Sequence, residues 1–383
     1  MKILMLNYEF PPIGGGGGQA HRSLLAQYAG RKDLTVDVLT SGTGTGLSVE
    51  QFADGITLHK VGIPKKDMHY WHRAEVIDWL LKAKPPYRRL LHEGSYDLVH
   101  AFFGFPTGWL CYRTAGRLPY IVSLRGSDVP GCNTRLALEY RFLGPLVFKP
   151  IWKHAARLVA CSEGLKARAL RFLPSVEIDV IPNGVDLARF SPGRAEPPGD
   201  EPYANTKPLR LLTVGRLSLT KRLPLLIEMM EMLHAEEVNA TLTIVGGGAL
   251  EAELRQSLGE KNLRDVVTIM GRRESDQMPG LYREHDVFVS ASAQEGMSNA
   301  MLEAMASGLP IITTRCEGVQ ELIVDNGVVV DDPQPAKLAE AVKALREDLP
   351  LRRKMAVAAR RHAERFGWDR VAQAYLQLYA EVK

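Results

Sequence analysis

The chain has 383 residues, too many for one typical domain, and its 45% hydrophobic and 24% charged residues are ordinary for a globular protein. Four widely spaced cysteines without a C-x-x-C pair favour reduced thiols over a disulfide framework or a zinc site: Cys111, Cys132, Cys161 and Cys316. No apolar run approaches the ~18 residues of a membrane span, and the apolar start is too short for a signal peptide, so we expect a cytoplasmic protein.

The net charge of +4 is unevenly divided. Residues 1–199 carry 25 Lys and Arg against 17 Asp and Glu, a balance of +8, whereas residues 200–383 carry 23 against 27, a balance of −4. The basic half also contains these aromatic residues: Tyr70, Trp71, Tyr87, Tyr140, Phe142, Phe148 and Trp152. One interpretation is a surface that contacts an anionic membrane, at the inner face, or an acidic acceptor; the other is a solvated basic surface over buried aromatics. We expect no nucleic-acid partner, because no nucleic-acid-binding module is recognisable.

Short apolar strands alternate with helical stretches along both halves. Strands are expected at 2–7, 35–40, 98–101, 120–124, 158–161 and 178–181, and then at 209–214, 241–245, 266–270, 286–289 and 311–314. This alternation predicts an α/β fold with parallel sheets covered by helices. The segment 191–208, rich in Pro, Gly and charge, is the predicted linker.

The loop after the first strand holds five consecutive glycines, Gly14 to Gly18, before a helix expected from Gln19 to about Gly30. Glycines let a backbone approach a phosphate or sugar closely. The run satisfies a dinucleotide fingerprint only trivially, and the strand at 35–40 does not end in the acid that would hold an adenosine ribose. NAD binding is therefore disfavoured.

Three polar residues of the first half follow predicted strands: His100, Arg125 and Asp128. Open parallel sheets bind ligands at the carboxyl ends of their strands. A lone His at a strand end can equally be structural, whereas Arg125, flanked by Gly126, is free to meet an anionic or hydroxylated ligand.

In the second half, the strand at 209–214 leads into a turn that carries Arg216 and Lys221. Two cations at the end of a strand suit a diphosphate, although they can also be ordinary surface charges. The loop contains no G-x-x-x-x-G-K-[ST] motif and is not a Walker loop. Gly246 to Gly248, after the next strand, predict a close backbone contact.

The stretch from Ser290 to Pro310 predicts a strand, a polar loop and a helix from about Ser298 to Ser307 that ends at Gly308. The N-terminus of such a helix favours an anionic ligand. Glu295 in the loop and Glu303 in the helix can accept hydrogen bonds from neighbouring hydroxyls, which suits a sugar nucleotide better than a bare phosphate. Either Glu, taken alone, can also be an ordinary solvated acid.

Five motifs in order connect these elements. They are Phe10-Pro-Pro12 before the glycine turn, Asn183-Gly-Val-Asp186, Val214-Gly-Arg216 with Lys221, Glu295-x7-Glu303 followed by Ala306-Ser-Gly-Leu-Pro310, and Phe366-Gly-Trp-Asp369. Together they resemble the retaining glycosyltransferases of the GT-B fold, in the large family that includes sucrose and glycogen synthase relatives. The resemblance covers essentially the whole chain.

The resemblance implies two Rossmann-like domains facing a cleft. Residues 1–191 would form the acceptor-side domain, residues 209–365 the nucleotide-sugar domain, and residues 366–383 a terminal helix that packs back on the first domain.

The resemblance also implies residue roles. Arg216 and Lys221 would bind the donor diphosphate, Glu303 the ribose hydroxyls, and Glu295 the donor sugar. Further donor contacts would come from Gly15, Gly16, Gly17, Gly215, Arg272, Gly296, Met297, Ser298 and Asn299. Catalysis would rest on Glu295, Arg216, Lys221 and Arg125, with His100 and Asp128 on the acceptor side.

One position departs from the family. Many members carry His-Gly where this chain has Arg125-Gly126, so no catalytic His is transferred there, and Arg125 is a candidate for phosphate or sugar contact.

The expected activity is transfer of a hexosyl-type sugar from a UDP- or GDP-sugar, with retention and without metal or cofactor. The acceptor would be a glycan, a lipid-linked or a small molecule, as in polysaccharide biosynthesis. Two alternatives stay open: a GT-B sugar-nucleotide epimerase, and a non-catalytic sugar-nucleotide-binding module.

Overall fold

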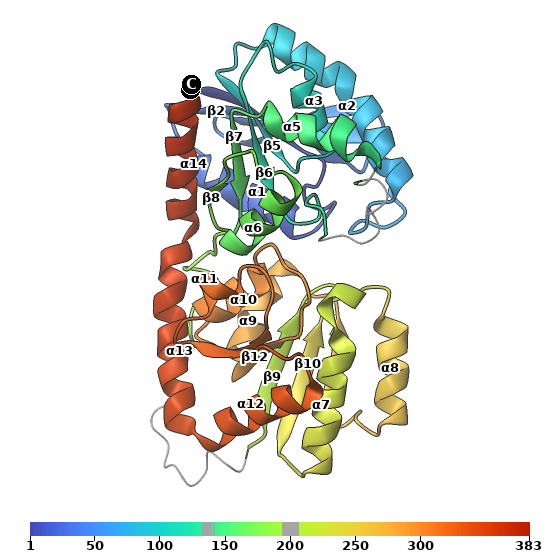
Figure 1. Cartoon of the computed structure of the whole chain (residues 1–383), viewed down its shortest axis with the longest axis vertical. Helices are drawn as coiled ribbons and strands as arrows, with labels where there is room; N and C mark the ends of the chain where they lie inside the picture. The colour runs from blue at the N-terminus through green and yellow to red at the C-terminus, as the bar shows by residue number, and fades with distance from the viewer. Residues whose placement is uncertain (132–139, 141, 194–206) are drawn as a thin grey trace. The chain divides into compact units, whose positions relative to one another are not determined.

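The computed structural model describes residues 1–131, 140, 142–193 and 207–383, and it divides into two compact units (Figure 1). Unit 1 comprises Met1–Gly184 and Trp368–Lys383, and unit 2 comprises Val185–Gly367. These divisions lie a few residues from the boundaries expected at 191 and 365. Most of the predicted linker, and Cys132, lie outside the described residues.

Unit 1 is built on an eight-stranded sheet in the order β3-β4-β2-β1-β5-β6-β7-β8. Its strands are β1 (Lys2–Asn7), β2 (Thr35–Gly42), β3 (Leu47–Ala53), β4 (Ile56–Gly62), β5 (Leu98–Phe102), β6 (Tyr120–Leu124), β7 (Arg157–Ala160) and β8 (Asp179–Val180). All neighbours are parallel except β3 and β4, which form an antiparallel pair at the edge. The sequence analysis missed this pair because β3 is polar and mostly exposed, so it lacks the apolar run of a buried strand.

Six α-helices and one π-helical turn among the described residues accompany the sheet of unit 1. They are α1 (Gly16–Tyr28), α2 (Arg73–Glu93), α3 (Thr107–Tyr112), the π-helical turn η2 (Gly144–Phe148), α5 (Lys149–Lys153), α6 (Glu163–Phe172) and α14 (Trp368–Val382). Helix α3 packs between α2 and α5, and α1 packs on α14. The terminal helix therefore belongs to unit 1, where its apolar stripe is buried.

Helix α1 begins at Gly16, three residues before the expected start at Gln19. A Cβ atom at Gly17 would lie 2.6 Å from Cζ of Phe103, and one at Gly18 would lie 3.0 Å from the carbonyl oxygen of Glu9. The missing side chains thus allow the first turn of the helix to pack directly on neighbouring loops.

Two of the short motifs meet where the chain leaves and re-enters unit 1. A Cβ atom at Gly184 would lie 2.5 Å from the Trp368 ring, so only glycine fits under that indole. Within unit 2, the N–H of Val185 donates to the carbonyl of Phe366 at 2.8 Å.

Unit 2 contains a six-stranded, fully parallel sheet in the order β11-β10-β9-β12-β13-β14. Its strands are β9 (Leu209–Val214), β10 (Ala240–Val245), β11 (Val267–Gly271), β12 (Val287–Ser290), β13 (Ile311–Thr314) and β14 (Gly327–Val330). Every strand that the sequence predicts in this half is present. This is the strand order of a Rossmann sheet. The first three strands are added toward one edge and the last three toward the other, so the order reverses between β9 and β12.

Helices cover both faces of this sheet (Figure 1). They are α7 (Leu223–Ala235), α8 (Glu251–Glu260), α9 (Met278–Arg283), α10 (Asn299–Ala306), α11 (Val319–Leu322), α12 (Pro335–Glu347) and α13 (Leu349–Ala363), with short 3-10 turns at η4 (Leu219–Lys221), η5 (Ser275–Gln277) and η6 (Glu364–Phe366). Helices α7, α8 and α12 bury a large apolar core against the sheet, and α10 packs on α9 and α13. No helix in the described ranges has the length and apolar character needed to cross a membrane.

Candidate active site

The reversal of strand order in unit 2 marks the expected ligand site. Two strands that diverge from a switch point leave a crevice beyond their carboxyl ends. The loop after β9 carries Arg216 and Lys221, and the loop after β12 carries Glu295 and leads into α10. The two neighbouring strands that flank this point, β9 and β12, are therefore followed by all four predicted polar residues: Arg216, Lys221, Glu295 and Glu303.

Glycines behind the β9 loop set its path. A Cβ atom at Gly246 would lie 1.9 Å from the carbonyl oxygen of Gly215, and one at Gly248 would lie 2.4 Å from that of Leu217. The N–H of Leu217 donates to the carbonyl of Gly247 at 3.1 Å. The close backbone contact predicted for Gly246 to Gly248 is confirmed, and its partner is the loop that carries the two cations.

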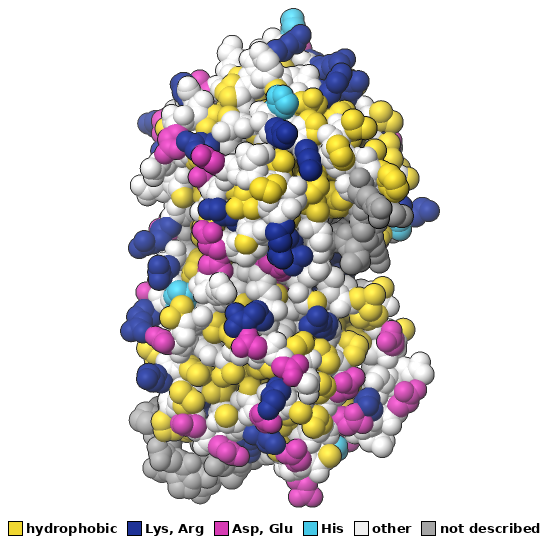
Figure 2. Space-filling model, viewed as in Figure 1, with side chains coloured by type: hydrophobic (Ala, Val, Ile, Leu, Met, Phe, Trp, Pro, Cys, Tyr) yellow, Lys and Arg dark blue, Asp and Glu magenta, His cyan; other side chains and the backbone are white. Residues whose placement is uncertain are grey.

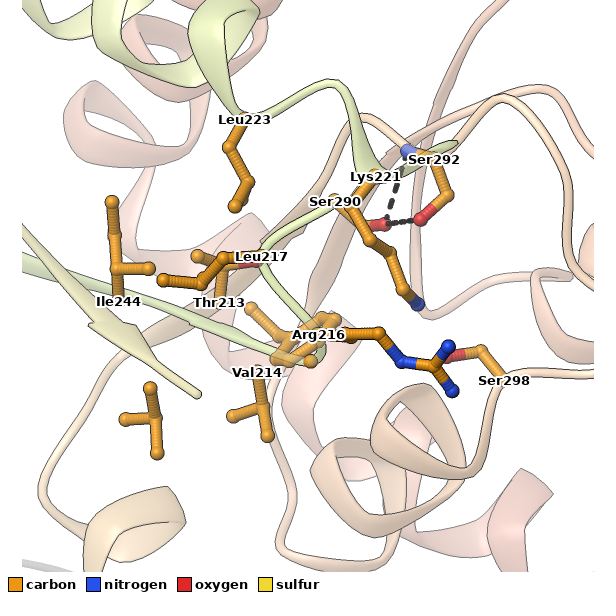
Figure 3. Close-up of a pocket in the computed structure, with 13 residues that line it drawn as sticks. Thr213, Val214, Arg216, Leu217, Lys221, Leu223, Ile244, Ser290, Ser292 and Ser298 are labelled. Atoms are coloured by element: carbon orange, nitrogen blue, oxygen red, sulfur yellow. Dashed lines mark hydrogen bonds between the residues drawn. The ribbon is translucent and has the colours of Figure 1, made fainter. Parts of the chain in front are cut away.

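Arg216 and Lys221 lie at a hollow in unit 2 (Figure 3). The hollow is lined by Thr213, Val214, Gly215, Arg216, Leu217, Lys221, Leu223, Ile244, Val245, Phe288, Ser290, Ser292 and Ser298. In Figure 3 the Arg216 guanidinium extends toward Ser298, and the Lys221 ammonium lies nearby. Two positive charges from one loop thus face the start of α10.

Glu295 is ion-paired with Lys221, and both side chains are largely buried, with 16% and 22% of their surfaces exposed. The same carboxylate oxygen accepts a hydrogen bond from the Ser292 hydroxyl at 3.1 Å. The backbone N–H of Glu295 donates to Oε2 of Glu317 at 3.2 Å. Its carboxylate is therefore held by Lys221 and Ser292, two residues that line the hollow, while Glu317 holds its backbone.

Helix α10 begins with a side-chain cap. The hydroxyl of Ser298 accepts from the N–H of Met301 at 3.3 Å, as the sequence predicts for the start of this helix. The positive end of the helix dipole and its first N–H groups are directed toward the side of the hollow that Ser298 lines.

Glu303 lies one turn into α10, and its carboxylate accepts a hydrogen bond from the Tyr282 hydroxyl at 2.8 Å. Burial raises the pKa of Glu303 to about 7, although the Tyr282 hydrogen bond and the charge of Arg189 act in the opposite direction. This carboxylate therefore changes charge near neutral pH.

Arg272, which follows β11, is exposed, and its side chain lies over Gly247. A Cβ atom at Gly247 would lie 3.0 Å from its Nε. Arg272 therefore borders the same glycine loop that supports Arg216.

The acceptor-side candidates of unit 1 have a different environment. His100 is fully buried, its Nδ1 is 2.7 Å from the Tyr379 hydroxyl, and its Nε2 is 2.8 Å from the Ser123 hydroxyl. Burial lowers the pKa of His100 to about 3, so the ring is neutral. Both ring nitrogens have partners within the core, and an acceptor contact of His100 stays an untested prediction.

Asp128 is also buried, and it organises the loops after β5 and β6. Its two carboxylate oxygens accept from the N–H groups of Gly104, at 2.7 Å, and Arg125, at 2.8 Å. Burial raises its pKa, against the lowering effect of these hydrogen bonds. The Asp128 carboxylate therefore connects the two loops, and its contact with an acceptor stays an untested prediction.

Arg125 and the glycine turn keep some exposure in unit 1. The Arg125 guanidinium donates to Oδ1 of Asn183 at 2.5 Å and lies 5.6 Å from the centre of the Phe102 ring. Gly15 to Gly17 form the start of α1, and the N–H of Gly15 donates to Glu9 at 3.1 Å. Contact of these groups with a donor stays a prediction.

Comparisons with known proteins agree with this architecture. The model of the family described as Glycosyl transferases group 1 matches residues 200–362, and that described as Glycosyltransferase Family 4 matches residues 15–189. A D-inositol 3-phosphate glycosyltransferase of Salinispora arenicola is 30% identical over 331 residues, which cover 75% of this chain and 69% of the relative. The chain belongs to the group 1 glycosyltransferases.

Solved structures show that this glycosyltransferase has the GT-B fold, with two Rossmann-like domains. Sucrose-phosphate synthase from Thermosynechococcus elongatus is similar with a TM-score of 0.77 and 21% identity, covering 99% of this chain and 98% of the other. Anabaena HepE in complex with UDP-glucose is similar with a TM-score of 0.76 and 20% identity, covering 100% of both chains.

The sequence did not predict several contacts of the candidate residues. Ser292, Glu317 and Tyr282 contact Glu295 or Glu303, and Asn183 fixes Arg125. Ser292 lies in the predicted loop, so its proximity was available as a signal. Glu317 and Tyr282 come from other loops and helices, and no local pattern connects them with the acids that they contact. In the ranges that the structure describes, no cluster of three or more His, Cys, Asp or Glu is placed to hold a metal.

Proposed function

We propose that this glycosyltransferase moves a hexosyl-type sugar from a UDP- or GDP-sugar to a hydroxyl of a glycan, lipid-linked or small-molecule acceptor, with retention and without a metal. The observation that carries the proposal is that Arg216, Lys221 and the start of α10 line one hollow at the strand-order reversal of unit 2, with Glu295 ion-paired to Lys221. A nucleoside-diphosphate sugar carries the complementary groups, a negative diphosphate and two sets of hydroxyls.

The diphosphate is assigned to Arg216, Lys221 and the start of α10. Arg provides a planar set of donors, Lys a compact charge, and the helix N-terminus the positive end of its dipole. The ribose is assigned to Glu303, whose carboxylate is held by Tyr282. The similarity to HepE, solved with UDP-glucose, supports this class of donor.

Glu295 is assigned to the hydroxyls of the donor sugar. Its ion pair with Lys221 holds the carboxylate in place, and a diphosphate in the hollow would share the lysine charge with it. Glu317, which accepts from the Glu295 N–H, is a positioning residue in this arrangement.

During transfer, the bond between the anomeric carbon and the phosphate oxygen breaks, and a bond to the acceptor oxygen forms on the same face. The acceptor proton passes to the leaving phosphate, so no protein base is required. Negative charge grows on the diphosphate as the bond breaks, and Arg216, Lys221 and the α10 terminus stabilise it. In this proposal these groups supply the charge compensation that a divalent cation provides elsewhere.

A donor screen followed by a transfer assay tests the proposal. A ligand at 100 times its Kd adds about 2.7 kcal/mol of stability, so UDP- and GDP-sugars are compared by thermal unfolding. The stabilising donor is then incubated with saccharide acceptors, with and without EDTA, and the anomeric configuration of the product is read by NMR. Loss of activity with EDTA, or an inverted product, would contradict the corresponding part. Conversion of the donor without an acceptor would favour the epimerase alternative.

A further inference from the structure

The segment 63–72 joins β4 to α2 and packs on the glycine turn of unit 1. Strands β1 and β4 run parallel, with β2 between them, so the loops that follow them leave the same edge of the sheet. The N–H of Gly14 donates to the carbonyl of Met68 at 2.7 Å, and Nδ1 of His69 lies 2.8 Å from the carbonyl oxygen of Gly14. Since a carbonyl only accepts, Nδ1 carries the proton. Segment 63–72 therefore binds both backbone groups of Gly14.

Glu9 also holds the glycine turn. Gly14 has a φ of 99°, and a Cβ atom there would lie 2.6 Å from Cβ of Glu9, so only glycine fits. Oε2 of Glu9 accepts a hydrogen bond from the N–H of Gly15 at 3.1 Å. The start of the glycine turn is therefore held by contacts with both Glu9 and His69.

A buried ion pair fixes segment 63–72 itself. Lys and Arg side chains are spread over the face of the molecule shown in Figure 2, whereas the Lys65 side chain is only 2% exposed. Its Nζ lies 2.6 Å from Oε2 of Glu75 and 3.9 Å from the centre of the Trp71 ring. The carboxylate of Glu75 also accepts from the N–H groups of Lys66, at 3.1 Å, and His72, at 2.9 Å. Glu75, in the first turn of α2, therefore binds residues near both ends of the segment.

Aromatic rings connect this ion pair with the loops after β1 and β5. The centre of the Trp71 ring lies 4.9 Å from that of Tyr8, which lies 5.0 Å from that of Phe103. Phe103 is the residue that leaves no room for a side chain at Gly17. One chain of contacts therefore runs from the Lys65–Glu75 pair to the first turn of α1.

We propose that His69 and the Lys65–Glu75 pair are positioning residues, which hold the glycine turn in the conformation that transfer requires. The inference rests on the proposed function and on the predicted contact of this turn with the donor. The three side chains act without touching the donor: His69 acts through Gly14, and the ion pair acts through segment 63–72. A glycine run by itself samples many backbone conformations, and contacts that select one of them lower the entropic cost of binding.

Exchange of backbone amides measures the turn without any substrate. His69→Leu removes the donor to Gly14, so the peptide that contains Gly14 and Gly15 should exchange about three- to tenfold faster, as expected for loss of one hydrogen bond. His69→Asn should restore the protection, because its amide nitrogen can take the place of Nδ1. Unchanged exchange in His69→Leu would show that His69 does not hold the turn, and would overturn the proposal.

Transfer kinetics distinguish positioning from a purely structural role. We expect His69→Leu to lower kcat/KM by a similar factor and His69→Asn to recover most of it, with no larger change in Tm than in the control. The control is His154→Leu, because Nδ1 of His154 also lies 2.9 Å from a backbone carbonyl, that of Pro150, but at an exposed position at the end of α5. Faster exchange of the turn in His69→Leu with wild-type kcat/KM would show that transfer does not need this positioning.

Lys65→Met tests the ion pair, and Lys60→Met is its control. Lys60 pairs with Glu50 in the antiparallel pair β3–β4, outside segment 63–72. Lys65→Met should accelerate exchange of the turn and of the segment about tenfold or more, because the buried Glu75 loses its cation, whereas Lys60→Met should leave both unchanged. Equal exchange in the two variants would overturn the role of the ion pair.

The His69 variants carry the test if Lys65→Met does not fold. The wild-type transfer assay decides the proposed function, and the exchange of the variants decides the positioning role. The two failures are therefore distinguishable.

Discussion

The two sheets hold their polar candidate residues in opposite environments. In unit 1, His100 in the middle of β5 and Asp128 after β6 are buried, and each bonds to groups of its own unit. In unit 2, Arg216 is exposed and Lys221 is partly exposed, both lining a hollow, and Glu295, paired with Lys221, also keeps part of its surface exposed. A polar residue at a strand end is therefore a site candidate only if the surrounding chain leaves it accessible.

Packing accounts for the difference. Helix α14 packs in unit 1 and contributes Tyr379, whose hydroxyl bonds to Nδ1 of His100. The His100 ring therefore helps to hold that helix in place. The corresponding edge of unit 2 is bordered by glycines 246 to 248, which remove side-chain volume and let the β9 loop lie against the β10 loop. At this edge of unit 2, the missing side chains bring the two loops together, and the cations of the β9 loop lie at the hollow.

Removing a cation from the hollow is expected to have the largest effect. Lys221→Ala or Arg216→Ala should lower kcat/KM for transfer by about 100-fold, as loss of a charge contact to the leaving diphosphate would. Lys261→Ala, which removes a partly exposed cation of unit 2 paired with Glu231, is the control. Near-wild-type transfer by both the Lys221 and the Arg216 variant would show that the cations at the hollow do not bind the leaving diphosphate.

Adding a methyl group at Gly246 tests the role of the missing side chains. The new Cβ would collide with the Gly215 carbonyl at 1.9 Å, and the φ of 141° already strains any other residue. We expect Gly246→Ala to cost about 2–4 kcal/mol in thermal unfolding and to impair donor binding.

Gly280 is the matched control for Gly246. It lies in α9 and has no atom within 4 Å of an added Cβ. Gly280→Ala should be neutral or stabilise the protein by about 0.5–1 kcal/mol. Equal stability of the two variants would show that the glycine contact does not hold the β9 loop.

The sequence was informative where a signal is local. A strand, a loop and a capped helix follow one another within about twenty residues at 286–307, and there the predicted elements and their order are confirmed. The same holds for β9 and its cations, whose loop directly follows an apolar run. The roles of these residues stay predictions, because a role depends on a ligand.

The sequence was uninformative where a contact joins distant segments. His100 lies 279 residues from Tyr379, and no periodicity indicates that their side chains meet. The β3–β4 hairpin was missed because its outer strand is polar. Glu317 contacts the Glu295 backbone through a loop that follows a different strand. These features depend on tertiary packing, which local patterns do not encode.

The structural role assigned to His100 predicts a change in stability without a change in chemistry. Tyr379→Phe leaves Nδ1 of a buried imidazole without a partner, which should cost about 1–3 kcal/mol. Thermal unfolding measures this cost, and kcat/KM should stay near wild type. Tyr112→Phe, at a partly exposed ring of unit 1, is the control. A drop in kcat/KM with unchanged stability would show that His100 takes part in transfer.

The smallest expected effect is a pH dependence that originates in Glu303. Since burial raises the pKa of this carboxyl from 4.5 to about 7, its neutral form is favoured in the fold. Its contribution to stability without ligand is complete below pH 4.5 and is lost as pH rises through 7. A ribose needs the ionised form as acceptor, so affinity has the opposite trend.

Affinity for the sugar nucleotide should therefore rise about tenfold between pH 6 and pH 8, as the ionised fraction of Glu303 rises. A sugar nucleotide is the suitable probe because its phosphates stay fully ionised over this range, and calorimetry measures its binding. Glu303→Gln should flatten the profile. Tyr282→Phe should move the profile to higher pH. The Tyr282 hydrogen bond lowers the pKa of Glu303, so its removal raises that pKa. If Glu303→Gln retains the wild-type profile, the ribose is bound elsewhere, and the buried acid of α10 is structural, like Asp128 in unit 1.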